Sequence, residues 1–174
     1  MFDPTIFDNI KVILEGRIYD LDLEGKIIIV QRNDWVDLAR MSRKYRIQFR
    51  LLAGNQEETA EVTLSAGTED LTMEILEIEN ENKPGCEISI RFYTVIENPD
   101  QQCKHIEEKI NQIWNYRPIL TQTIHYIYPN TGKMNNEILL QFGRKIDEDN
   151  IEDIPELIEY TLKTLEALSL LNKK

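Results

Sequence analysis

Residues 45–66 read YRIQFRLLAGNQEETAEVTLSA, with apolar side chains at every second position on both sides of the polar segment Ala53–Gln56. This period of two is typical of β-strands that turn one face toward a protein core. The sequence therefore predicts an antiparallel hairpin with a four-residue turn. That turn length places Ile47 opposite Val62, so apolar side chains meet across the hairpin.

The polar face of the same hairpin supports this register. Gln48 is placed opposite Glu61, and Arg46 and Arg50 are diagonal to it. Hydrogen-bonding groups and opposite charges are thus cross-strand neighbours, an arrangement that stabilises paired strands.

The composition indicates one folded domain. The chain has 174 residues, of which 41% are hydrophobic and 29% charged, as in ordinary globular proteins. The formal net charge of −11 argues against a nucleic-acid partner, because phosphate binding needs clustered Lys and Arg. The longest apolar runs, such as Ile27–Val30, are only a few residues, so we expect no membrane span.

The N-terminus and the cysteines favour a cytoplasmic protein. Met1–Pro4 lacks the basic region followed by an apolar run that an export signal contains. Cys86 and Cys103 are the only cysteines, too few for a disulfide framework. We expect two buried, reduced thiols.

The first part of the chain is expected to be a β-meander. Three short strand candidates are separated by Glu-Gly pairs, which favour tight turns. They are Ile10–Leu14, Arg17–Leu23 and Lys26–Gln31. A short helix is then predicted from Asn33 or Asp34, either of which can cap it, to about Arg43.

Leu71–Glu79 fits two structures. Its Glu-rich composition favours a helix, whereas the alternation of Leu71, Met73 and Ile75 favours a strand with a bulge, which is our prediction. Asn80–Gly85 is predicted to be a turn.

The second part should contain two further helices. Cys86–Glu97 is apolar on one face and partly on the other, which predicts an interior strand covered on both sides for part of its length. A helix should begin at Asn98, with Pro99 in its first turn and Gln101 returning to the cap, and end before Pro118.

A second hairpin, Leu120–Tyr128 with Glu137–Gly143, and a helix at Ile154–Leu171 follow. The apolar stripe of this helix is broad. It predicts packing on the sheet, with a dimer seam as the alternative.

These elements predict one α+β domain over residues 1–174, with a mainly antiparallel β-sheet built from an N-terminal meander plus later hairpins. About three helices are expected, the last one long and amphipathic. A possible sub-structure is a β-rich half, residues 1–97, and a helix-hairpin-helix half, residues 98–174. The order of elements in the second half is similar to the α-β-β-α portion of small secretion-chaperone-like domains. This resemblance implies that Leu165 and Leu168 face a partner.

Charge is segregated along the chain. A basic run has no acid from Leu38 to Gln56, and an acidic run has no base from Asp147 to Glu159. The candidate interaction residues in these runs are Arg40, Arg43, Arg46, Arg50, Asp149 and Glu152. Such patches can pair within the fold, across a dimer or with a partner, but two solvated faces are the simpler interpretation.

The sequence offers no catalytic, cofactor-binding or metal-binding constellation. Asp20–Gly25 begins like a calcium loop, but Gln31 stands where the loop needs a bidentate Glu. His105 and His125 lack further ligands at suitable spacing. We expect neither a cofactor nor a metal.

The sequence therefore favours a non-enzymatic, cytoplasmic interaction protein, an adaptor or chaperone-like binder that associates with a protein partner or with itself. The alternative is a ligand-binding or catalytic domain. Its pocket would lie between sheet and helices, where Arg46, Arg50 or His125 would recognise a small anion.

Overall fold

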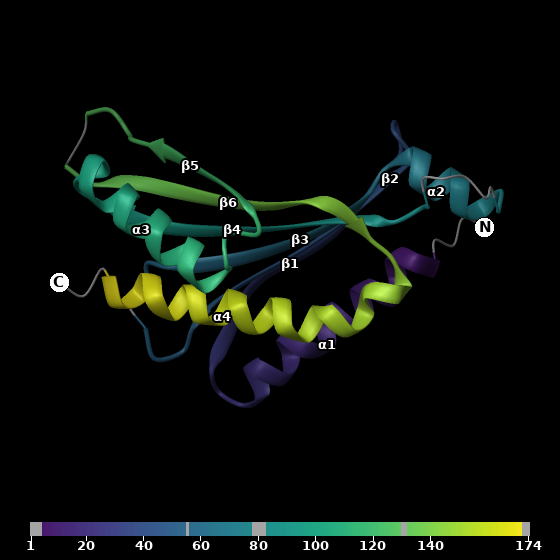
Figure 1. Ribbon diagram of the computed structural model, residues 1–174, viewed down its shortest axis with the longest axis horizontal. Helices are drawn as coiled ribbons and strands as arrows, with labels where there is room; N and C mark the ends of the chain where they lie inside the picture. The colour runs from purple at the N-terminus through teal and green to yellow at the C-terminus, as the bar shows by residue number, and fades with distance from the viewer. Residues whose placement is uncertain (1–4, 55, 78–82, 130–131, 172–174) are drawn as a thin grey trace.

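The computed structural model describes residues 5–54, 56–77, 83–129 and 132–171. Within these residues the chain forms one α+β domain with a six-stranded antiparallel sheet in the order β1-β2-β3-β4-β6-β5 (Figure 1). The strands are β1 (Ile27–Asp37), β2 (Ser42–Leu51), β3 (Thr59–Ala66), β4 (Cys86–Ile96), β5 (Ile119–His125) and β6 (Met134–Ile146). The helices are α1 (Thr5–Leu23), α2 (Thr68–Ile75), α3 (Pro99–Ile113), the 3₁₀ turn η1 (Glu148–Asp153) and α4 (Ile154–Leu171).

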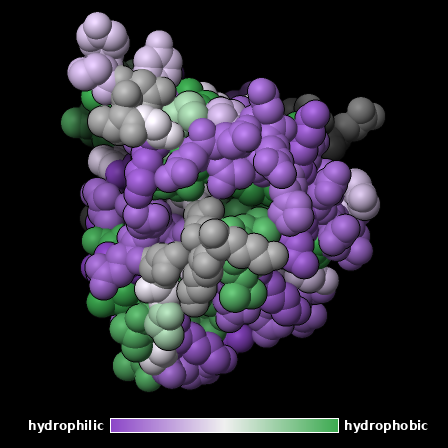
Figure 2. Space-filling view, turned by 90° about the vertical axis from the view of Figure 1, so that its left-hand side faces the viewer, coloured by the Kyte–Doolittle hydropathy of each residue, from purple (hydrophilic) through white to green (hydrophobic). Residues whose placement is uncertain are grey.

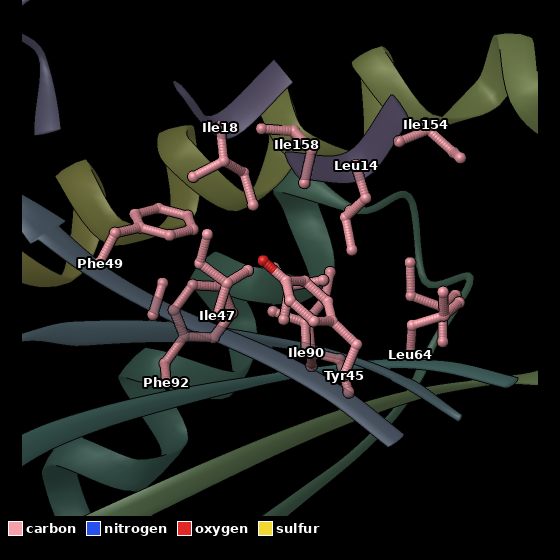
Figure 3. Close-up of a cluster of buried hydrophobic side chains, with 14 of the residues drawn as sticks. Leu14, Ile18, Tyr45, Ile47, Phe49, Leu64, Ile90, Phe92, Ile154 and Ile158 are labelled. Carbon is pink, nitrogen blue, oxygen red and sulfur yellow. The ribbon is translucent and has the colours of Figure 1, made fainter. Parts of the chain in front are cut away.

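The core lies between the sheet and helices α1, α3 and α4, which share one side of it (Figure 1). Figure 3 shows Ile18 of α1 and Ile158 of α4 pointing toward Ile47 and Ile90 of the sheet. All four side chains are fully buried. Because burial of apolar surface is the main driving force of folding, this layer holds helices and sheet together.

The predicted central hairpin is confirmed in register. Ile47 pairs with Val62, and Gln48 pairs with Glu61. The strand at Cys86–Ile96 is confirmed too, between β3 and β6. Because β4 pairs with β6, the two halves of the chain contribute to one sheet.

The predicted N-terminal meander is wrong. Ile10–Leu14 and Arg17–Leu23 both belong to α1, and only the third candidate, Lys26–Gln31, falls in a strand. The buried residues of α1 recur every three or four positions, the period of a helix, and are Phe7, Ile10, Leu14, Ile18 and Leu21. Of the two Glu-Gly pairs, only the second makes a turn, with Gly25 at a φ of 71°.

Two further predictions are corrected. The helix expected from Asn33 or Asp34 is absent, because β1 pairs with β2 as far as Asp37. Leu71–Glu79 is not a strand: α2 covers its first part, with Leu71 and Met73 buried. Residues 78–79 and part of the predicted turn Asn80–Gly85 lie outside the described residues.

The later elements agree with the sequence. Asn98 caps α3 by accepting from the backbone N–H of Gln101 at 3.4 Å. The predicted return of the Gln101 side chain to the cap is wrong: it is Gln102 that accepts from the backbone N–H groups of Glu97 and Asn98, both at 2.8 Å. The predicted last helix, Ile154–Leu171, matches α4 at both ends.

Candidate functional site on the open face of the sheet

The side of the sheet away from the helices is not covered by any described segment (Figure 1). We call it the open face. Its side chains alternate along the strands with buried core residues. They include Trp35, Arg46, Gln48, Glu61, Arg91, Tyr93, Glu137, Leu139 and His125. The covering of β4 on both sides that its sequence predicts is therefore wrong, and Tyr93 and Val95 remain half-buried.

Glu61 is buried on this open face, with 2% of its surface exposed. Its carboxylate accepts hydrogen bonds from Gln48 Nε2 at 2.5 Å and from the Tyr93 hydroxyl at 3.2 Å. Arg46 and Arg91 lie 3.6 and 3.5 Å from it. A buried carboxylate needs such partners, because desolvation of an unpaired charge costs several kcal/mol, ~5 or more.

Tyr93 fits this environment as a donor. Burial, followed by the nearby charges of Glu61 and Glu137, raises the pKa of its phenol to about 12. The hydroxyl therefore keeps its proton near neutral pH and donates a hydrogen bond to Glu61.

A continuous line of contacts crosses the sheet through Glu61. Arg46 lies 4.8 Å over the Trp35 ring, an arrangement typical of a cation–π contact. On the other side, Arg91 lies 3.1 Å from Glu137, whose second carboxylate oxygen is 3.7 Å from His125 Nε2. We call this line the cross-strand ladder: Trp35, Arg46, Glu61, Arg91, Glu137 and His125, one residue from each of the six described strands.

The structure divides the predicted basic run between two faces. Arg46 belongs to the ladder, and Arg50 is half-buried on the open face beside it. Arg43 lies on the helix side, 3.2 Å from Asp34 and 4.7 Å over the Phe7 ring. Arg40 is exposed in the β1–β2 turn, where its carbonyl accepts from the Thr68 hydroxyl.

The predicted acidic run lies on the helix side, in η1 and the start of α4. Asp149 is 3.7 Å from Lys83, and Glu152 is exposed. Among the described ion pairs, none joins the acidic run to the basic run. In the described residues, the two runs therefore do not pair with each other within the fold.

Leu165 and Leu168 lie in the core, 0% and 2% exposed. The expectation that they face a partner is contradicted by this placement, because both point into the layer between α4 and the sheet. The packing of α4 on the sheet, which the broad apolar stripe favours, accounts for them. Hydrophilic residues occupy most of the surface in the end-on view of Figure 2, where hydrophobic residues form separate smaller groups.

Arg91 and Glu137 were missed by sequence reasoning, whereas the diagonal contact of Arg46 with Glu61 was expected from the hairpin register. The difference lies in chain order. Strands β2 and β3 follow each other, but β4 and β6 are separated by α3 and β5. The one signal in the sequence was that Arg91 and Glu137 carry opposite charges at outward-facing positions of two strands.

A second feature is a pocket of about 310 Å³ between β6, α4 and the end of α3. Trp114 is central to its wall, with ring centroids 5.5 Å from Phe142 and 5.4 Å from Tyr160. Arg117, Arg144, Asp153 and Glu156 also line it. His125, Arg46 and Arg50 lie elsewhere, so the cations predicted for a pocket between sheet and helices are not the ones found there.

No protein-family model matches the chain, and neither a curated protein nor a solved structure is similar to it. In the described residues, no group of three or more His, Cys, Asp or Glu is placed to hold a metal ion. None of the described helices combines the length and apolar character needed to cross a membrane.

Proposed function

We propose that this chain is a non-enzymatic protein-interaction module that binds its partner through the open face. The observation that carries the proposal is the cross-strand ladder, in which the nearly buried Glu61 fixes Arg46 and Arg91 on an otherwise uncovered sheet. Side chains that are already held in place lose little conformational entropy on binding.

The residue types of the open face support the same proposal. Arg, Trp and Tyr are the side chains that most often dominate binding energy in protein interfaces. On the open face they are represented by Arg46, Arg91, Trp35 and Tyr93. Basic and acidic groups alternate across the strands, so the matching partner is a folded surface with the reverse alternation.

The experiment compares two variants with the same substitution. Leu139→Lys places a charge on the open face beside Arg91, whereas Leu170→Lys places it on the exposed side of α4. The lysine can reach water in the free chain at both sites, so both variants should fold.

Wild-type chain and both variants are immobilised and exposed to an extract of the native host. We expect proteins that are retained by the wild type and by Leu170→Lys but lost with Leu139→Lys. The same set of captured proteins on all three would contradict the proposal.

A second candidate function rests on the aromatic pocket. Its size and its aromatic wall are those of small-molecule sites, and Arg117 and Arg144 suit a carboxylate or phosphate. Asn115, which lines the pocket, has a φ of 51°, a left-handed conformation that is enriched at functional sites.

Thermal-shift titration with a panel of small aromatic carboxylates and phosphates tests this pocket. A saturable rise in Tm that disappears in Arg117→Gln and persists in Arg40→Gln would support it. Arg40 is a suitable control because it is exposed in a distant turn. Equal shifts in both variants would indicate a nonspecific effect of charge and contradict the candidate.

A further inference from the structure

We infer that the partner of the open face is a second copy of this chain, related by a two-fold axis that lies in the interface and crosses the ladder midway between Glu61 and Arg91. This inference rests on the proposed function. It names the partner of the same surface, from the order of charges along the ladder.

The signs of the ladder are reversed about its midpoint. From β2 to β6 they run plus, minus, plus, minus, through Arg46, Glu61, Arg91 and Glu137. A two-fold axis perpendicular to the ladder therefore brings Arg46 of one copy over Glu137 of the other, while the Glu61–Arg91 pairs of the two copies cross each other at the axis. A symmetric dimer interface requires this kind of self-complementarity, in which one patch binds itself after rotation.

The positions along the strands obey the same symmetry. Glu61 and Arg91 are directly opposite each other. Arg46 lies two residues before Gln48, the partner of Glu61, and Glu137 is opposite Tyr93, two residues after Arg91. The next step outward shifts by two residues again on each side, to Trp35 and to His125.

The ladder consequently crosses the sheet on a diagonal. With about 4.8 Å between strands and about 3.3 Å per residue along them, its angle to the strands is roughly 45°. Rotation about an axis perpendicular to the ladder then makes the strands of the two sheets cross at about 90°. This is one of the two crossing geometries that packed sheets adopt.

Contacts beyond the charges fit this arrangement as well. The same rotation places Trp35 of one copy against His125 of the other, two flat rings at the ends of the ladder. It also turns the row of Gln48, Glu61, Arg91 and Leu139 by about 90°, so that Leu139 of one copy lies over the paired Thr63 and Ser89 of the other. Glu61 is already desolvated in the single chain, so covering it removes little further water.

The first test measures the molar mass of the purified chain by light scattering over a concentration series. We expect a dimer that dissociates at least about tenfold more readily in Leu139→Lys, and no such change in Leu170→Lys. High salt should weaken the dimer, because the pairs across the interface are ionic. A dimer that both variants leave intact would overturn the inference.

The second test reports the axis itself. Trp35→Cys and His125→Cys are made separately in a Cys103→Ala background, and the two proteins are mixed and oxidised. Cys86 can remain, because it is 1% exposed and burial raises the pKa of its thiol to about 12. Residues 35 and 125 lie on the outermost strands, so a disulfide between them must join two chains.

We expect a covalent dimer in the mixture and none in either protein alone. Cross-linking of either protein with itself, or no cross-link in a dimeric mixture, would overturn the proposed axis. A chain that stays monomeric at high concentration would overturn the second copy as partner. In that case, capture of host proteins that Leu139→Lys abolishes would still support the proposed function, and its absence would overturn both.

Discussion

Lys145 Nζ lies 2.7 Å from Asp70 Oδ1 and 2.9 Å from Oδ2, a contact that joins α2 to the end of β6. The backbone N–H of Gly85, just before β4, donates to the same carboxylate at 3.2 Å. One side chain of α2 thus connects two neighbouring strands at one end of the sheet.

We predict that the contact between Lys145 and Asp70 stabilises the fold at neutral pH and that this stabilisation is lost in alkaline solution. The hydrogen bond to Asp70 raises the pKa of Lys145 above its ordinary value of 10.5; partial burial opposes this shift, and the negative charge of Asp70 adds to it. A raised pKa in the folded state means that the pair stabilises fully below the unfolded pKa and that this stabilisation is lost as pH rises through the folded pKa. In denaturant unfolding, the difference in free energy between wild type and Lys145→Met should be constant below the unfolded pKa of Lys145 and should shrink as the pH rises through its raised folded-state pKa. An unchanged difference would contradict this assignment.

The packing of α4 on the sheet predicts that alanine substitution of two of its leucines changes stability by very different amounts. Leu165→Ala should lower the free energy of unfolding by about 2–4 kcal/mol, because it leaves a cavity against the sheet. Leu170→Ala, at a side chain that is 64% exposed, should change it by less than about 0.5 kcal/mol. Chemical denaturation of both variants checks this pair, and equal effects would argue against the packing of α4 described above.

Two glycines predict changes of opposite sign. A Cβ at Gly85 would lie 2.8 Å from the carbonyl oxygen of Ile146, so Gly85→Ala should destabilise the fold by about 1–3 kcal/mol. A Cβ at Gly16 meets nothing within 4 Å and lies in α1, so Gly16→Ala should stabilise it by about 0.5–1 kcal/mol. Thermal unfolding measures both, and a destabilised Gly16→Ala would be inconsistent with a helix at that position.

Glu61→Gln should cost about 1–2 kcal/mol of stability, because it removes the charge that Arg46 and Arg91 share. The two arginines are partly solvated, which limits the loss. Glu57→Gln, in an exposed turn, is the control and should be nearly neutral. If Glu61→Gln were also neutral in denaturant unfolding, the ladder would not be held by its central carboxylate.

The sequence predicted most of the sheet because apolar alternation is a local signal. The hairpin of β2 and β3 needs only its own residues and a short turn, so even its register could be predicted. Helix α1 was missed because its Glu15-Gly16 pair resembles the turn at Glu24-Gly25, although Phe7, Ile10 and Leu14 already have helical spacing. The end of β1 was missed for another reason: Asn33 and Asp34 favour a helix start locally, and pairing with β2 overrides this preference.

The site was less predictable than the fold. Arg46 was singled out for its charge, and its contact with Glu61 follows from adjacent strands. Arg91 and Glu137 meet only because β6 lies between β4 and β5 in the sheet, which no local pattern in the sequence specifies. Leu165 and Leu168 show the converse, since an apolar stripe alone does not distinguish a core contact from an interface.

The position of α4 has a consequence for synthesis of the chain. A ribosome delivers all six described strands before this helix. The strand that precedes α4 is β6, which lies between β4 and β5 in the sheet. Until then the sheet surface under α4, with Val62 and Ile90, is open to water and to other nascent chains. We therefore expect the newly made chain to need protection from aggregation up to the moment its last helix leaves the exit tunnel.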